Sequence, residues 1–184
     1  MNETAPVAKV TIIYESMFGN TRKVAEAIAE GLRPTASVTV LPVKDAPESI
    51  GEADILIAGA PTHVHGLSRP STRTEAGKWA DDTARHLTLE PDAEGIGMRE
   101  WLETCGQVPS VFAAFDTRAD TAELFSGSAA SHIEKRLRKL GSRRFLPKES
   151  FVVDKRSVLV EGELERARSW GRTIGAELRT PALR

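Results

Sequence analysis

A chain of 184 residues with 40% hydrophobic and 28% charged residues is long enough to bury one substantial core, and we expect a single domain over residues 1–184. Its formal net charge of −1 gives no electrostatic footprint for nucleic acid or an anionic membrane surface. The single cysteine excludes an internal disulfide, no apolar run approaches the roughly 20 residues of a membrane span, and the N-terminus lacks a leader pattern. We therefore expect a soluble, cytoplasmic protein.

Five apolar segments rich in β-branched residues recur along the chain and alternate with helical patterns. Such alternation predicts a parallel β-sheet with helices on both faces. The continuous apolar runs at 55–58 and 111–114 are typical of strands that are covered on both sides. We therefore predict a doubly wound α/β fold with strands at residues 7–14, 37–43, 54–60, 108–115 and 150–153.

Helical periodicity fills the intervals between these strands. The first helix is predicted to end near Gly31, because Pro34 bars its continuation. Pro47 and Gly51 interrupt residues 45–53, which leaves room there for a brief helix. The long interval 71–107 divides into two helices separated by a polar loop. Beyond the first helix and the brief one, we predict helices at residues 72–85, 96–104, 128–140 and 162–178.

The junction between the first strand and the first helix carries the strongest functional signal. The apolar strand stops at a short polar loop that contains Ser16, Gly19, Asn20 and Thr21. The start of a helix offers unpaired N–H groups and the positive end of its dipole, which suits a phosphate. The hydroxyls and the amide add donors, and Gly19 lets the backbone close around the anion. A neutral donor set of this kind fits one terminal phosphomonoester.

Two common nucleotide motifs are absent from this loop. It has no lysine and no G-x-x-x-x-G-K-[ST] spacing, so it is not a nucleoside-triphosphate loop. It also lacks the G-x-G-x-x-G of a dinucleotide-binding fold. A plain connection with capping residues is the competing interpretation, because Ser, Asn and Thr all favour helix starts. The hydroxyl spacing and the neighbouring glycine go beyond capping and favour the phosphate site.

The strand, the loop and the helix together resemble the signature of flavodoxin-like proteins, an apolar strand with an aromatic residue followed by [ST]-x-[TS]-x-G-[NT]-T. Here Tyr14 supplies the aromatic residue and the loop reads SMFGNT. The segments PTHVHGLSRPSTR, GMREWL and FDTR resemble a bacterial branch of the same family. The resemblance implies a five-stranded sheet of order 2-1-3-4-5 with FMN at the switch between strands 1 and 3, an arrangement of which flavodoxin is itself the standard example.

Ligands of open α/β sheets bind beyond the carboxyl ends of the strands, and three loops leave such ends here. The resemblance implies that the first loop holds the FMN phosphate and that the other two flank the isoalloxazine ring. Phe18 replaces the small or hydroxyl residue usual at its place, which removes one expected donor. No catalytic side chain and no metal ligand is assigned, since FMN would carry the chemistry. The predicted FMN-binding residues are Ser16, Met17, Phe18, Gly19, Asn20, Thr21, Pro61, Thr62, His63, Val64, His65, Gly66, Phe115, Asp116, Thr117 and Arg118.

The ring-binding loops depart from the family pattern, in which a tryptophan or another apolar residue and a tyrosine enclose the flavin. The single tyrosine, Tyr14, lies inside the first strand. The tryptophans all fall on predicted helices, where we expect them to pack in the core: Trp79, Trp101 and Trp170. Residues 61–67 are candidates to cover one ring face, and Phe115 or Arg118 the other. Because an aromatic pair contributes roughly 0.5–1.5 kcal/mol beyond area burial, we expect weaker FMN retention than in typical flavodoxins.

Cationic side chains near the ring would affect its redox potential. Reduced FMN tends to carry a negative charge, so the sequence predicts that His63, His65, Arg69 and Arg118 raise the two-electron potential. The net charge of −1 agrees with this, because the carrier flavodoxins that the chain resembles are strongly acidic and dock basic partners.

The histidines and the cysteine admit simpler interpretations as well. His63 and His65 would point to the same side of an extended segment, as in some metal sites, but no acidic residue or cysteine nearby in the sequence completes a shell. Contacts with a ring or a substrate are favoured, and plain surface exposure is the alternative. His86 and His132 are expected to be exposed, and Cys105 to be a small buried residue rather than a nucleophile.

The resulting prediction is an FMN-binding protein that acts in electron transfer. Two roles remain open, a one-electron carrier that docks a redox partner protein and an NAD(P)H-linked reductase of quinone-like acceptors. Few aromatic residues and near-neutral charge weigh against the carrier, while no nicotinamide site is recognisable. A third hypothesis is a binding or regulatory module that has lost FMN; the absent aromatic pair supports it and the intact loop opposes it. The sequence does not decide between them, nor does it give the oligomeric state.

Overall fold

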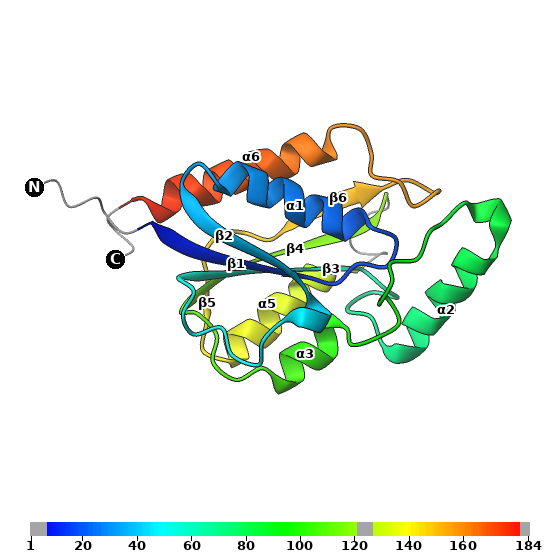
Figure 1. Ribbon diagram of the computed structural model, residues 1–184, viewed down its shortest axis with the longest axis horizontal. Helices are drawn as coiled ribbons and strands as arrows, with labels where there is room; N and C mark the ends of the chain where they lie inside the picture. The colour runs from blue at the N-terminus through cyan, green and yellow to red at the C-terminus, as the bar shows by residue number, and fades with distance from the viewer. Residues whose placement is uncertain (1–6, 121–126, 181–184) are drawn as a thin grey trace, which may run out of the picture.

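A parallel β-sheet forms the centre of the computed structural model, which describes residues 7–120 and 127–180 (Figure 1). Its order is β2-β1-β3-β4-β5, with β6 also paired to β4. The predicted fold class and strand order are thereby confirmed. Within the described residues the sheet consists of β1 Ala8–Tyr14, β2 Ala36–Pro42, β3 Ile55–Pro61, β4 Val111–Ala119, β5 Arg143–Arg144 and β6 Glu149–Val153.

Two short strands, rather than one, line the outer side of β4. β5 pairs with the start of β4 and β6 with its end, both in parallel. The fifth strand predicted from the sequence corresponds to β6. The sequence did not predict β5, because two consecutive arginines carry neither an apolar run nor an alternating pattern.

Side chains from the last helix, α6 (Glu163–Leu178), bind the backbone at the free edge of β6. The Glu163 carboxylate accepts a hydrogen bond from the N–H of Val152 at 2.6 Å, and the Arg166 guanidinium donates to the carbonyl of Ser150. The N–H of Val160 donates to the carbonyl of Val152 at 3.0 Å. These groups at the sheet edge are therefore paired within the chain.

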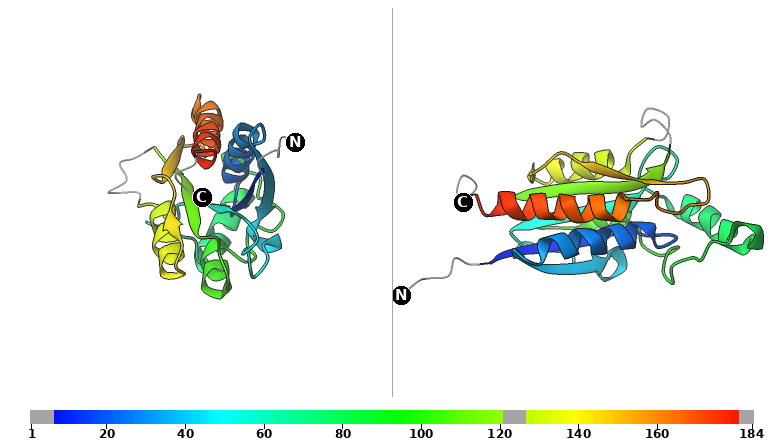
Figure 2. Two further views of the ribbon diagram at one scale, coloured as in Figure 1. Left: turned by 90° about the vertical axis from the view of Figure 1, so that its left-hand side faces the viewer. Right: turned by 90° about the horizontal axis from the view of Figure 1, so that it is seen from above.

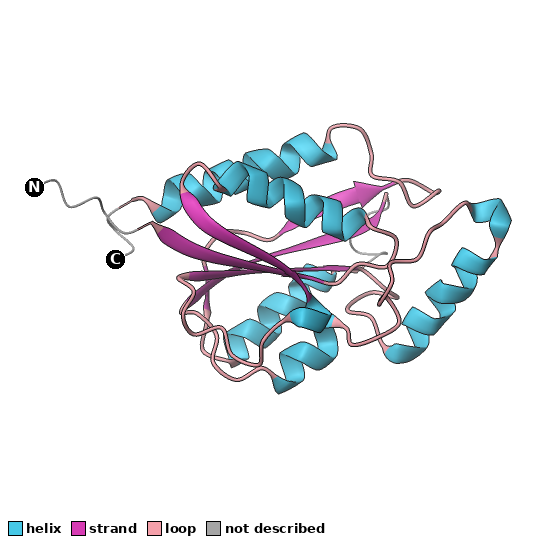
Figure 3. Ribbon diagram, in the orientation of Figure 1, coloured by secondary structure: helices cyan, strands magenta, loops and turns pink. Residues whose placement is uncertain are grey.

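Helices cover the sheet on both faces. α1 (Asn20–Leu32) lies beside α6 on one face, and α3 (Met98–Thr104) and α5 (Ala129–Lys139) lie on the other (Figures 1 and 2). α2 (Pro70–Asp81) projects past the carboxyl ends of the strands instead of covering a face (Figure 3). In the described part of the chain, no helix is long and apolar enough to cross a membrane.

The observed helix ends follow local capping. The helix predicted over 72–85 begins earlier, at Pro70, a residue preset for a first helical turn; a separate 3-10 helix, η2 (Thr83–Arg85), follows it. The helix predicted over 96–104 begins later, because Glu100 accepts a hydrogen bond from the N–H of Gly97 at 2.8 Å and caps the start. The brief helix expected over 45–53 is wrong: a 3-10 turn, η1 (Val43–Asp45), precedes that segment, and Pro47 and Gly51 lie in irregular structure.

Glycines allow α1 and α6 to approach closely. A Cβ on Gly171 of α6 would collide with the carbonyl oxygen of Ile28, and a Cβ on Gly31 of α1 would collide with that of Arg168. Both glycines are buried. The contact holds α1 in place over the sheet, and thereby fixes where its first turn lies.

Replacing Gly171 by alanine should therefore destabilise the protein. We expect Gly171→Ala to lower the free energy of unfolding by about 1–3 kcal/mol, because the helices must separate to admit the methyl group and this outweighs the better helix propensity of alanine. Ser169→Ala, at an exposed position of the same helix, should stay within about 0.5 kcal/mol of wild type. Urea unfolding of both variants makes the measurement, and equal stabilities would contradict the close approach.

Candidate functional site

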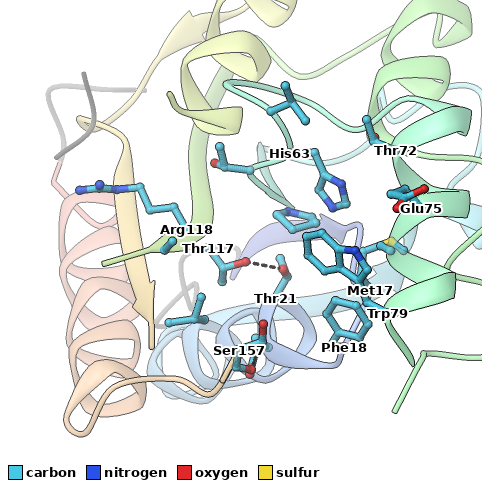
Figure 4. Close-up of a pocket in the computed structure, with 17 residues that line it drawn as sticks. Met17, Phe18, Thr21, His63, Thr72, Glu75, Trp79, Thr117, Arg118 and Ser157 are labelled. Atoms are coloured by element: carbon cyan, nitrogen blue, oxygen red, sulfur yellow. Dashed lines mark hydrogen bonds between the residues drawn. The ribbon is translucent and has the colours of Figure 1, made fainter. Parts of the chain in front are cut away.

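A cavity of about 330 Å³ opens at the carboxyl ends of β1, β3 and β4 (Figure 4). All three loops that the sequence predicted to converge contribute to its lining, together with one face of α2 and the segment after β6. A volume of this size is typical of a small-molecule site.

Hydroxyl groups at the start of α1 form the polar end of the cavity. Thr21, 1% exposed, shares a hydrogen bond of 2.8 Å between its Oγ1 and the Oγ1 of Thr117 at the end of β4. The Thr62 Oγ1 also lines the cavity; it accepts the N–H of Ala129 at 3.0 Å, so its own proton can point elsewhere. The side-chain amide of Asn20 donates to the Ser157 carbonyl at 2.6 Å. Neutral donors beside a helix start fit a phosphomonoester, as the sequence indicated.

The remaining residues of the first loop have different positions. Met17 and Phe18 line the cavity, whereas Ser16 faces a neighbouring cavity of about 240 Å³ and accepts the N–H of Gly19 at 3.1 Å. Gly19 has a φ of 84°, in the left-handed region that glycine tolerates. The N–H of Glu90 donates to the carbonyl of Met17 at 2.8 Å and ties the loop to the segment before α3.

The second loop makes a tight turn between His63 and Gly66. The N–H groups of His63 and Gly66 each donate to the other's carbonyl, at 2.8 and 2.9 Å, and Val64 and His65 have φ values of 39° and 71°. Pro61, Thr62, His63 and Val64 line the cavity, but His65 and Gly66 lie outside its lining. Because the segment is turned and not extended, the two histidines do not share a side as the metal hypothesis assumed. No cluster of three or more potential metal-ligating side chains occurs in the part of the chain that the structure describes.

The third loop divides between core and cavity. Phe115 is fully buried; its ring lies edge-on to Phe151 and Trp170, with centroids 6.2 and 6.4 Å apart. Asp116 is also buried, and its Oδ2 accepts hydrogen bonds from Ser128 at 2.6 Å and from the N–H of Ala130 at 3.0 Å, at the start of α5. Neither residue lines the cavity, so we leave both out of the proposed binding set. The cavity lining includes the next two residues, Thr117 and Arg118.

The cavity carries less positive charge than the sequence predicted. Burial, to which the nearby Arg73 guanidinium adds, lowers the pKa of His63 to about 4, so this ring is neutral at pH 7. His65 and Arg69 lie outside the lining. Among the described lining residues, Arg118 and Glu75 carry opposite charges on different elements. Of the four residues that the sequence predicted as cations near the ring, Arg118 is therefore the charged one in the lining.

One wall of the cavity was not predicted. α2 contributes Thr72, Glu75, Ala76 and Trp79, which recur at spacings of three and four and so share one helical face. Sequence analysis placed Trp79 in the core, but it is 43% exposed, whereas Trp101 and Trp170 are buried as expected. The spacing was visible in the sequence. Which side of α2 faces the strands depends on tertiary contacts.

A buried polar cluster connects this wall to the first loop. Arg73 of α2, 2% exposed, donates to the Ser68 hydroxyl at 2.9 Å and pairs with Glu100 at 3.1 Å. Glu15, directly before the loop, accepts the N–H of Met98 at 2.7 Å. Burial raises the pKa of the Glu15 carboxyl. Sequence analysis gave these residues no role.

The other expectations for single residues are met. His86 and His132 are exposed, and Cys105 is buried, where burial raises the pKa of its thiol.

An open, doubly wound parallel sheet with a cavity at the carboxyl ends of its strands is typical of mononucleotide-binding α/β proteins. The model of one such family, described as Flavodoxin, matches residues 12–170. The chain therefore belongs to the flavodoxin family. No curated protein sequence matches it.

Solved structures with the same fold include several flavodoxins. The chain is 18% identical to Flavodoxin 1 from Bacillus cereus, with a TM-score of 0.64 and coverage of 94% of this chain and 100% of that one. A flavodoxin from the domain Archaea is 20% identical, with a TM-score of 0.62 and coverage of 94% and 99%. The rubredoxin oxygen:oxidoreductase of Desulfovibrio gigas is 21% identical, with a TM-score of 0.57, and this chain covers 38% of it.

The neutral state of His63 predicts a pH dependence of stability. Because its folded pKa of about 4 lies below the ordinary value of 6.5, the unfolded chain binds the proton more readily between these values. The stabilisation is therefore complete above about pH 6.5 and is lost as the pH falls toward 4. When the pH is lowered from 7.5 to 4.5, we expect the free energy of unfolding of wild type to fall by roughly 2 kcal/mol more than that of His63→Gln.

Urea unfolding of both proteins at the two pH values makes this measurement. Val64→Ala changes the adjacent residue, which is 79% exposed and does not titrate, and should follow wild type at both pH values. If the free energies of unfolding of His63→Gln and wild type change by the same amount between the two pH values, His63 is not held neutral by the fold.

Proposed function

We propose that the protein binds FMN and acts in electron transfer, with the FMN phosphate at the start of α1. The hydrogen-bonded hydroxyls of Thr21 and Thr117 at this helix start, in a cavity that Thr62 also lines, support the proposal most strongly. Membership of the flavodoxin family supports it independently. Bound FMN would supply the redox chemistry, and the protein would supply position and electrostatics.

The proposed binding set is narrower than the sequence suggested. Ser16 and Gly19 would shape the first loop, and Asn20 would hold it against Ser157. The ring would lie among the remaining lining residues, which include Arg118. The proposed set is Met17, Phe18, Asn20, Thr21, Pro61, Thr62, His63, Val64, Thr117 and Arg118.

Within electron transfer, one form of the proposal is a carrier that docks a redox partner protein in the cytoplasm. The Desulfovibrio gigas relative is named as an oxidoreductase, but this chain covers only 38% of that protein, so the name is not carried over to this chain. Reduction of quinone-like acceptors by NAD(P)H is the alternative outcome of the experiment that follows.

The visible absorption spectrum of the purified protein, before and after addition of FMN, tests the proposal. Flavin bands that stay with the protein through gel filtration are expected. Absence of bands together with unquenched FMN fluorescence would identify a module that has lost the cofactor. If FMN binds, NADPH consumption with a quinone acceptor distinguishes a reductase from a carrier, which should show none.

Removing the Thr21 hydroxyl should weaken the binding of FMN, which has a phosphate, more than that of riboflavin, which has none. We expect Thr21→Val to raise the dissociation constant of FMN by roughly tenfold or more, since a hydrogen bond to a charged group is lost. Riboflavin, which lacks the phosphate, should bind within about twofold of wild type. Ser16→Ala should affect FMN less, because that hydroxyl accepts the N–H of Gly19 away from the cavity.

Flavin fluorescence titrations give these constants. Thr173→Val, at an exposed position of α6, is the matched control and should leave both ligands unaffected. Equal weakening of FMN and riboflavin by Thr21→Val would place the phosphate elsewhere.

A further inference from the structure

Trp79 differs from the other tryptophans in its surroundings. Trp101 and Trp170 are buried, whereas Trp79 is 43% exposed on a helix that lies beyond the sheet. Its indole lies beside Met17 and Phe18 at the cavity (Figure 4). Its indole therefore presents apolar surface at the wall of the cavity that a planar ligand could cover.

A cation holds the indole from outside the cavity. The Arg85 guanidinium carbon lies 5.2 Å from the centroid of the Trp79 ring, within the range of a cation–π contact. The Arg85 Nε lies 3.2 Å from the Asp82 Oδ2, and Arg85 is not part of the cavity lining. The indole is therefore supported on the side that the cavity does not use.

The helix that carries Trp79 is itself fixed at its first turns. Arg73 and Ala76 are the buried residues of α2. The Arg73 guanidinium is bound by Ser68 and Glu100, and Ala76 packs with Met17 in a small apolar cluster. These contacts turn the face with Thr72 and Trp79 toward the cavity.

We propose that Trp79 covers the isoalloxazine ring of FMN, as a wall supplied by the β3–β4 crossover helix. The proposal rests on the proposed function, since it assumes that FMN is the occupant. Across the cavity from Trp79 the lining comes from the end of β4, with Thr117 and with Arg118, whose side chain is directed away from Trp79 (Figure 4). A planar ring is the ligand chemistry that a preplaced indole contacts best.

Two ligands separate the ring contact from the phosphate contact. Trp79→Leu should raise the dissociation constants of FMN and riboflavin by the same factor, about three- to tenfold, because both carry the ring. Thr21→Val, in contrast, should weaken FMN alone. Trp79→Phe keeps an aromatic face and should stay within about threefold of wild type. Thr74→Ala, exposed on α2 outside the lining, is the matched control and should change neither constant.

Chemical modification gives a readout that does not depend on affinity. N-bromosuccinimide applied in the dark should oxidise Trp79 first in the protein without ligand, as located by peptide mass spectrometry. Saturating FMN should slow that oxidation at least fivefold, while the buried Trp101 and Trp170 serve as internal references. Urea unfolding of each variant confirms that the fold is intact.

The possible failures are distinguishable. If FMN does not bind to wild type at all, the proposed function fails and this inference fails with it. If FMN binds but Trp79 stays equally reactive and Trp79→Leu binds both ligands as wild type does, Trp79 is not the ring wall, and the FMN site itself stands.

Discussion

The buried hydrogen bond between Thr21 and Thr117 joins the first turn of α1 to the end of β4, and the site is arranged around this contact. The hydrogen bond forms only if α1 lies at the right position over the sheet. The close packing of α1 against α6 at Gly31 and Gly171 sets that position. The pairing of Pro61 with Thr117 fixes the register of β3 and β4, and so places the end of β3 beside this contact. Helix packing and strand register thus bring hydroxyl groups from two segments that are far apart in the sequence into contact at the cavity.

The second constraint acts on α2, which lies beyond the sheet and has few buried residues. A buried arginine is costly to leave unpaired, so Arg73 holds its helix where Ser68 and Glu100 can satisfy it. The same region contains Glu15, which directly precedes the first loop. The Glu15 Oε1 has no hydrogen-bond partner in the described structure. The segment before the first loop and the helix that carries Trp79 therefore both contact this buried polar cluster.

Much of the fold and part of the site could be predicted from the sequence. The strands that lead to Tyr14 and Pro61 are apolar runs bounded by polar loops, and the donors at the start of α1 are local features. Phe115 and Asp116, which the sequence placed in the site, are buried outside the cavity lining, because a strand covered on both faces has no alternation to show which residues turn inward. The position of Trp79 was beyond prediction, since tertiary contacts of Arg73 decide which face of α2 meets the cavity.

The outer side of the sheet has a consequence for how the protein behaves in a crowded cell. A free strand edge is a template on which another chain can add a strand, which leads to aggregation. Here β5 is two residues long and consists of arginines, and the backbone of β6 is already engaged by Glu163 and Arg166. An incoming strand would have to displace these side chains and approach two positive charges. The last helix thus occupies backbone groups to which another strand could pair, at the edge where the sheet is interrupted.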